Sequence, residues 1–293
     1  DSWFSIDFIG HYDGNHKKII GNSKRGYHLF RTITNSEIKN INLDNSGLSS
    51  VVKNSTCVQC QAVLNLFNTV DNGQISHCQG KIIANHVKNS TISCCKSRSV
   101  LVRFDVDSSH ITDCQALLEL PIYNDHNFTE AGGIAQTVIN NSTVERCFVS
   151  GKVINYNSNN RLYFQGIAHT VENSELCNNA VGSIHIKTDN TSFDFRICAE
   201  FSYSWIDNNI AISSPNQSFD NDLILNGKNI APVLFTQNYF EHNLGWDFTT
   251  IWQWNDKRNE PELRATESQS SSQNPSVNTG SLLAQQLQAN IWL

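Results

Sequence analysis

Short runs of β-branched and aliphatic residues recur along the first 180 residues and are separated by polar turn residues. Each copy reads aliphatic-x-Asn-Ser-x-aliphatic-x-x-Cys. The copies centre on Asn35-Ser36, Asn54-Ser55, Asn72-Gly73, Asn89-Ser90, Ser108-Ser109, Asn141-Ser142 and Asn173-Ser174. The spacing is 17 to 19 residues at first, and 33 and then 32 residues later. Such a period indicates one supersecondary unit stacked many times.

Three slots of the repeat are apolar. The slot two residues before each Asn holds Ile33, Val52, Val70, Val87, Val106, Ile139 and Val171, and the slot three residues after it is also apolar. The slot six residues after holds Cys60, Cys78, Cys95, Cys114 and Cys147, followed by Asn179. Short β-branched runs predict strands, and the scarcity of Asn-Gly and Asp-Gly turns argues against hairpins. We therefore predict an all-β chain that forms a right-handed parallel β-helix, with coils about 4.8 Å apart.

Two segments also resemble a known family. Gly133–Val138 (GIAQTV) and Gly166–Val171 (GIAHTV) are similar to the GLUG repeat of bacterial β-helix proteins, and residues 83–87 are a weaker copy. Residues 244–264 resemble the closing segment of such arrays. The family includes secreted and surface adhesins and the non-catalytic region of immunoglobulin-A-cleaving zinc metallopeptidases. The resemblance implies a role in recognition for this chain.

The non-repeating parts suggest a domain plan. Residues 1–30 alternate aromatic and aliphatic residues and are expected to cap the N-terminal end, because solenoid ends need covers. Residues 31–264 form the predicted repeat domain with a Trp-rich closing segment. Residues 265–280 are a low-complexity linker, and residues 281–293 are predicted to form a short amphipathic helix with Ser281 as its N-cap.

The composition argues against two kinds of partner, nucleic acid and the interior of a membrane. The 293 residues are 39% hydrophobic and 16% charged, and the net charge is -6. Binding of nucleic acid needs a surplus of Lys and Arg that is missing here, and no apolar run approaches the ~20 residues of a membrane span. The chain begins with neither an initiator Met nor a signal peptide, so we expect it to be a processed product or part of a larger polypeptide.

The nine cysteines are compatible with several structural or chemical roles. Because Cys60 and its equivalents share one repeat slot, we expect an inward ladder of small apolar side chains. A zinc or redox role for the CxxC at Cys57 and Cys60, or a set of disulfides, remains an alternative. The odd number of cysteines suits a reducing destination. There is no second CxxC at zinc-ribbon spacing and no HExxH, so we predict no metal centre and no cofactor.

Carboxylates supply the candidates for catalysis. Asp105 and Asp107 lie two apart on a predicted strand and hence on one face, with Arg103 beside them and Asp113 about one turn further on. Paired carboxyl groups on stacked coils could cleave glycosidic bonds. The alternative is that Asp107 occupies a polar turn position while Asp105 and Arg103 are merely solvated.

Aromatic and aliphatic residues near the C-terminus supply the candidates for binding. Trp246, Trp252 and Trp254 could stack on sugars or contact a partner, or could instead cover the core. Leu283, Leu287 and Trp292 could place the predicted helix in a partner's groove, or could dock it on this molecule.

These observations lead to two hypotheses of function. The first is a bacterial secreted or surface-displayed recognition or scaffold module, an adhesin or virulence-associated domain with a protein or glycan ligand on the solenoid surface. Delivery into a host cytosol as an effector is the alternative location, because of the unpaired cysteines. The second hypothesis is a polysaccharide hydrolase or lyase with a carboxylate-lined groove.

Overall fold

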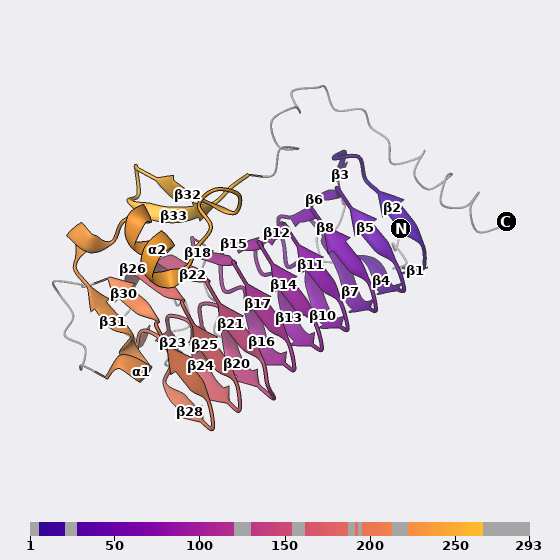
Figure 1. The fold of residues 1–293 in the computed structure, drawn as a ribbon. Helices are drawn as coiled ribbons and strands as arrows, with labels where there is room; N and C mark the ends of the chain where they lie inside the picture. Colours follow the sequence, from indigo (N-terminus) through magenta and orange to yellow (C-terminus); the bar gives the residue numbers. More distant parts are fainter. Residues whose placement is uncertain are drawn as a thin grey trace, which may run out of the picture.

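The computed structural model describes residues 6–20, 28–119, 130–153, 162–186, 191–192, 195–212 and 222–265. It confirms the prediction of an all-β parallel β-helix (Figure 1). Each coil of the chain contributes one strand to each of three parallel sheets, which contain nine, nine and ten strands. The predicted linker beyond Ala265 and the predicted helix at 281–293, with Leu283, Leu287 and Trp292, lie outside the described residues.

Strands of successive coils are neighbours in every sheet. Sheet A contains β1 (Ile6–Phe8), β4 (His28–Thr34), β7 (Gly47–Lys53), β10 (Phe67–Asp71), β13 (Ala84–Lys88), β16 (Val102–Asp107), β20 (Ala135–Ile139), β24 (Ala168–Glu172) and β28 (Glu200–Ser202). Sheet B contains β2 (His11–Asp13), β5 (Glu37–Lys39), β8 (Thr56–Val58), β11 (Gln74–Ser76), β14 (Thr91–Ser93), β17 (His110–Thr112), β21 (Thr143–Glu145), β25 (Glu175–Cys177) and β29 (Trp205–Asp207). Sheet C contains β3 (Lys18–Ile20), β6 (Asn42–Asp44), β9 (Gln61–Ala62), β12 (Gln79–Gly80), β15 (Lys96–Ser97), β18 (Gln115–Leu118), β22 (Phe148–Val153), β26 (Ala180–Ile186), β30 (Ile210–Ile212) and β31 (Lys228–Ile230).

The remaining elements lie beside the solenoid. A small parallel sheet is formed by β19 (Glu130–Gly132), β23 (Leu162–Gln165) and β27 (Thr191–Ser192). After the last coils come α1 (Leu223–Asn226), a 3₁₀ turn (Pro232–Leu234), α2 (Gln237–Leu244) and an antiparallel hairpin of β32 (Trp252–Asn255) and β33 (Glu260–Leu263).

The Asn-Ser corner of the repeat has a geometric cause. Asn54 and Asn89 have φ of 48° and 47°, a left-handed conformation that Asn tolerates better than most residues. The following serine is buried and bonds the next coil: the Ser90 N–H donates to Ser109 Oγ at 3.0 Å. The same bond joins Ser109 to Ser142. A serine ladder, interrupted only at Gly73 among these copies, therefore satisfies backbone donors that stacking removes from water.

The five predicted ladder cysteines, Cys60, Cys78, Cys95, Cys114 and Cys147, are all fully buried, and all nine cysteines are free thiols. The Cys60 N–H points to Cys78 Sγ at 3.4 Å, and the Cys78 N–H points to Cys95 Sγ at the same distance. The predicted ladder is thus confirmed. Where the cysteines stop, Asn179 Oδ1 accepts from the Cys147 N–H at 2.9 Å, so the amide takes over the role of the sulfur.

One predicted slot was wrong by a residue. Ile139 is only half-buried, and the inward position belongs to Val138, which pairs with Val106 and Val171. The coil has an extra turn residue, because Asn140 and Asn141 both adopt the left-handed conformation with φ of 59° and 62°. A one-residue insertion in a turn leaves the strand register intact, whereas one in a strand would reverse its faces.

Close stacking explains the glycines of the two Gly-Ile-Ala units. A Cβ added at Gly166 would lie 2.0 Å from Arg196 O, and one at Gly133 would lie 2.4 Å from Gly166 O. Both contacts are with backbone of the next coil, which no side-chain rotation relieves. Only glycine fits at this corner.

We therefore expect Gly166→Ala to lower the free energy of unfolding by about 3 kcal/mol, the upper part of the range for overpacked sites. Urea denaturation followed by circular dichroism measures the change. Gly73→Ser is the matched control, because every other copy carries serine in that slot and the atom nearest to an added Cβ is the side-chain Cγ1 of Val70, at 2.8 Å, rather than backbone. A small shift of Val70 relieves this contact, so the loss should be much smaller, at most ~1 kcal/mol. Equal losses in both variants would contradict this explanation.

The described part of the predicted N-terminal cap is itself a coil. Residues 6–20 form β1, β2 and β3, which pair in parallel with β4, β5 and β6. The inward-facing Phe8, Tyr12 and Ile19 are only partly buried, because the described residues place no coil before them.

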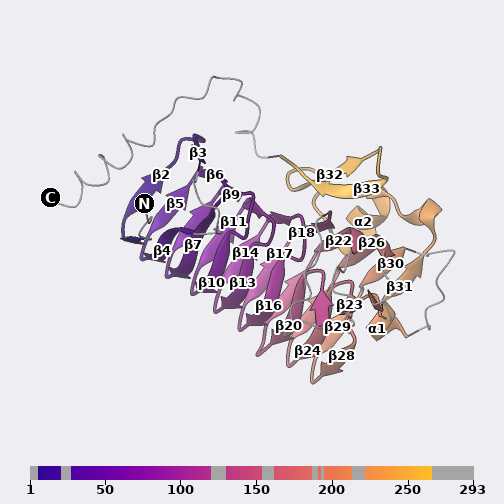
Figure 2. The same cartoon turned by 180° about the vertical axis from the view of Figure 1, so that it is seen from behind.

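The Trp-rich segment does not close the end of the solenoid. It lies along the outer side of sheet C (Figures 1 and 2), where it forms a second apolar cluster with Phe148 and Ile210 of that sheet. The outward row of sheet C reads Asn42, Gln61, Gln79, Lys96, Gln115, Phe148, Ala180 and Ile210 along the coils. The later, apolar coils need a cover, and the Trp-rich segment supplies it.

Candidate functional site

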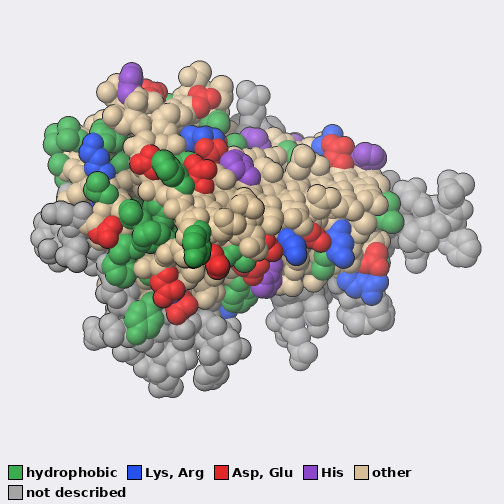
Figure 3. Space-filling view, turned by 60° about the horizontal axis from the view of Figure 1, so that its bottom comes forward, with side chains coloured by type: hydrophobic (Ala, Val, Ile, Leu, Met, Phe, Trp, Pro, Cys, Tyr) green, Lys and Arg blue, Asp and Glu red, His purple; other side chains and the backbone are tan. Residues whose placement is uncertain are grey.

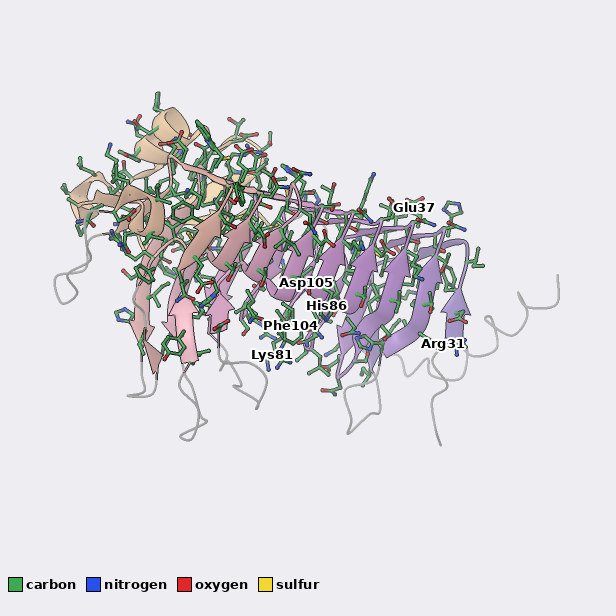
Figure 4. The ribbon with its side chains drawn as sticks, turned by 90° about the horizontal axis from the view of Figure 1, so that it is seen from below. Arg31, Glu37, Lys81, His86, Phe104 and Asp105 are labelled. Carbon is green, nitrogen blue, oxygen red and sulfur yellow. The ribbon has the colours of Figure 1, made fainter. Side chains whose placement is uncertain are left out.

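The outward side of sheet A carries a group of ionisable and aromatic side chains around β13 and β16. In Figure 4, Lys81, His86, Phe104 and Asp105 gather at one place on this side, while Arg31 and Glu37 lie apart near the first coils. α2 and the hairpin lie over sheet C instead (Figure 2), so they leave the outward face of sheet A uncovered.

His86 and Asp105 form the centre of this group. They come from neighbouring strands, β13 and β16, and stand in register. His86 Nδ1 lies 2.5 Å from Asp105 Oδ1, and the two side chains are 42% and 38% exposed. A ligand can therefore reach both partners without any change in the fold.

An aromatic and cationic stack extends from His86. Its ring lies parallel to that of Phe104, with centroids 5.0 Å apart and planes at 26°, and Arg103 Cζ lies 5.2 Å from the Phe104 centroid. The register of β13 against β16 shifts between Ala84 and His86, and such a bulge redirects side chains. Burial, together with the neighbouring Arg103 charge, lowers the pKa of Lys81.

Asp105 and Asp107 do share one face, flanking the buried Val106, but the chemistry of Asp107 is that of a fixed anion. Its carboxylate accepts from Asn140 Nδ2 at 2.9 Å and from Ser108 Oγ at 2.9 Å, and Lys88 Nζ lies 3.8 Å away. The Asn140 bond is the main cause that lowers the pKa of Asp107. Glycoside hydrolysis needs one carboxyl that stays protonated, and Asp107 is unsuited to that role.

Asp113 is not part of this face, contrary to the prediction. Its side chain is 6% exposed and lies at the turn between β17 and β18, where Arg146 Nε donates to it at 3.0 Å. Trp252 Nε1 approaches the same carboxylate at 3.4 Å. The chain bends sharply after Thr112, so a spacing that suggested one surface places Asp113 on another, under the Trp-rich segment.

The tryptophans predicted to bind a ligand are mostly inaccessible. Trp252 is fully buried and Trp246 is 3% exposed, with ring centroids 4.4 Å apart, and Trp254 is half-buried. Their role is the alternative one of covering the core. Among the described residues, the most exposed aromatic side chains are instead Tyr203 and Trp205 of the last coil. Comparing equivalent slots would have found them, since other copies carry mainly polar residues there.

The half-buried thiols outside the ladder are poor nucleophiles. Burial raises the pKa of Cys94 to about 12, with a further contribution from Asp113, and burial likewise raises the pKa of Cys177 to about 12. A thiol reacts as its thiolate, so neither residue suits nucleophilic catalysis near neutral pH.

We expect the native chain to resist thiol reagents at pH 8, where a pKa of about 12 leaves a thiolate fraction of only ~10⁻⁴. Labelling of Cys94 and Cys177, followed by mass spectrometry, should accelerate about tenfold per pH unit up to pH 10. After unfolding in guanidinium, all nine cysteines should react rapidly. Fast labelling of the folded chain at pH 8 would contradict the burial of these thiols.

Within the described ranges, no group of three or more His, Cys, Asp or Glu side chains could hold a metal ion. No helix in the described part of the chain has the length and apolarity needed to cross a bilayer.

Comparison with known proteins identifies no relative: no family model, no curated protein and no solved structure matches this chain.

Proposed function

We propose that this protein is a non-enzymatic recognition or scaffold module that binds an extended ligand along the open face of sheet A. The observation that carries the proposal is the partly exposed stack of Arg103, Phe104, His86 and Asp105 on neighbouring strands of sheet A. Aromatic rings and hydrogen-bonding groups side by side are suited to sugar rings. A glycan is therefore the favoured ligand, and a protein is the alternative.

The repeat supports a ligand that runs parallel to the solenoid axis. In register along sheet A stand Thr69, His86, Asp105, Thr137 and Thr170, one per coil. Coils are about 4.8 Å apart, which is comparable with the length of one pyranose unit. An extended polysaccharide would meet a polar side chain at each coil, so many weak contacts would add up without a deep pocket.

A polysaccharide hydrolase or lyase is the second candidate, because His86 and Asp105 form an accessible acid-base pair beside Asp107. Against it stands the lowered pKa of Asp107, which leaves that pair without a neighbouring proton-donating carboxyl.

One experiment separates the two functions. The purified chain is tested for binding to a panel of neutral and acidic polysaccharides, and the same mixtures are assayed for reducing ends and unsaturated sugars. We expect binding without turnover, weakened about tenfold by Phe104→Ala and by His86→Ala. Gln74→Ala on sheet B is the matched control and should bind normally. Turnover that is abolished by Asp105→Asn would show that the chain is an enzyme rather than a recognition module. Binding that is unaffected by Phe104→Ala would show that the ligand does not bind on this face.

We further propose a bacterial origin of GLUG type, with secretion or surface display as an adhesin, on the strength of the two Gly-Ile-Ala units. Delivery into a host cytosol is the alternative location, and the nine free cysteines support it, since oxidising compartments select for paired ones. Protease treatment of intact producing cells tests the location: a surface-displayed protein should be degraded, whereas a protein delivered into a host should be protected in the producing cell and recovered from the host cytosol.

A further inference from the structure

The last coil of the solenoid ends sheets A and B with bare strands. β28 and β29 are the final strands of these sheets, while sheet C continues through β30 and β31. No strand among the described residues pairs with the outer edges of β28 and β29, so part of their backbone N–H and C=O groups face outward. Unpaired edges of this kind are templates for another strand.

Aromatic residues occupy three slots of this coil that are aliphatic or mainly polar elsewhere. Trp205 pairs with Glu175 in a row that also contains Thr143 and His110, and it is 65% exposed. Tyr203 stands in the Asn position of the turn and is 93% exposed. Phe201 pairs with the inward Val171 but remains 43% exposed, since no described coil covers it.

Tyr203 is also held in an unfavourable backbone conformation. Its φ is 51°, in the left-handed region where the equivalent Asn173 has 45°. Bulky side chains rarely adopt this region, and the fold gains little packing from a ring that is almost wholly exposed. The turns of the solenoid impose this conformation on other residues too, as at His77 and Arg146, so what distinguishes Tyr203 is a large aromatic ring that is exposed there without a packing benefit.

The surroundings of these aromatic residues are apolar on one side and acidic on the other. α1 adds Leu223 and Ile224, which are 66% and 37% exposed, and Leu225 O of α1 accepts from the Ile197 N–H just before β28. Figure 3 shows apolar side chains gathered over the C-terminal half of the molecule, whereas the first coils present mainly polar side chains.

The charge of the last two coils indicates which kind of partner binds at this end of the solenoid. The last two coils carry Glu172, Glu175, Glu200 and Asp207, and Arg196, which is buried, is the one Lys or Arg in the described residues 162–186 and 195–212. Two copies meeting by this same end would bring like charges together, which opposes association. A basic partner gains attraction at the same positions.

We propose that this aromatic end, formed by Phe201, Tyr203, Trp205, Leu223 and Ile224, is a docking surface for an extended basic segment of another protein. The segment adds a strand to the free edge of β28 or β29. On β28 its apolar side chains cover the inward Phe201 while its basic side chains lie beside the outward Glu200. On β29 Trp205 and Asp207 point outward together, so its basic side chains lie over both of them. Exposed Tyr and Trp are the residues that most often dominate binding energy at such surfaces. The site is independent of the face of sheet A.

The test uses the full chain and a short peptide of alternating lysine and valine, with fluorescence anisotropy as the readout. We expect binding that falls steeply with added salt and is weakened at least tenfold by Tyr203→Asn and by Trp205→Thr. Because Tyr203→Asn restores the residue of the other copies, it should not lower the thermal midpoint, so lost binding would not reflect unfolding. Val233→Thr is the matched control, at an 80% exposed site in the 3₁₀ turn of the lateral segment, which comprises residues 232–265 beside sheet C and includes the Trp-rich segment.

Three outcomes would overturn the proposal. The first is binding of a peptide of alternating glutamate and valine as tight as that of the lysine-valine peptide, which would show that charge does not determine the partner. The second is undiminished binding by Tyr203→Asn. The third is self-association in sedimentation experiments that Tyr203→Asn abolishes, which would identify a second copy of this chain as the occupant.

Discussion

Replacing Trp252 with alanine is expected to lower the free energy of unfolding by about 3–5 kcal/mol, the range for large aromatic residues in cores. Trp252 is fully buried on the outer side of sheet C, where its ring packs on Trp246 at 4.4 Å between centroids. Its Nε1 also approaches the Asp113 carboxylate at 3.4 Å. The loss combines the transfer of apolar surface with a cavity that the rigid strands cannot close.

Urea denaturation followed by tryptophan fluorescence and by far-ultraviolet circular dichroism measures this change. We expect the lateral segment to detach before the solenoid unfolds, so the two signals should separate in the variant. Trp205→Ala is the control: its side chain is 65% exposed, and its stability should change by no more than ~0.5 kcal/mol. Similar losses in both variants would mean that Trp252 is not the anchor of the segment.

Removing the carboxylate of Asp113 should lower the free energy of unfolding by about 3 kcal/mol, near the lower end of the range for breaking a buried ion pair. Arg146 contacts both of its oxygens, at 3.0 and 3.1 Å, and is only 26% exposed, so Asp113→Ala would leave a poorly solvated cation. Glu145, at 2.7 Å from Arg146 Nη1, retains part of the pairing and limits the loss.

A double-mutant cycle tests the origin of this effect. The variant with both Asp113→Ala and Arg146→Met should be more stable than the sum of the single losses predicts, because no unpaired charge remains. Asp105→Ala, on the open face with a side chain 38% exposed, is the matched control and should change stability by less than ~1 kcal/mol. Strict additivity would argue against a coupled pair.

The contrast between Asp105 and Asp113 also bears on function. Both are acidic residues close in sequence to Asp107, yet one is accessible on sheet A and the other belongs to the interface with the lateral segment. That segment covers sheet C, so the two surfaces proposed for binding, the face of sheet A and the aromatic end, lie outside the area that it covers.

The sequence by itself determined the stacked strands, the inward aliphatic rows and the cysteine ladder. A strand places alternate side chains on opposite sides, and a period of about 18 residues brings equivalent positions into register, so the local pattern contains this information. The left-handed Asn turns follow in the same way, since the residue type selects the backbone conformation. Even the extra residue at Asn140 left β20 in register with β16 and β24.

Only the tertiary structure decided where the non-repeating residues lie. The position of Trp252, the burial of Asp113 and the exposure of Tyr203 depend on which side of which sheet the lateral segment covers. That choice is made by the outward row of sheet C, where Gln79 and Lys96 give way to Phe148 and Ile210 several coils later. These residues are far apart in the chain and become one surface only after the coils stack, because burial is a property of the assembled surface and not of a local pattern.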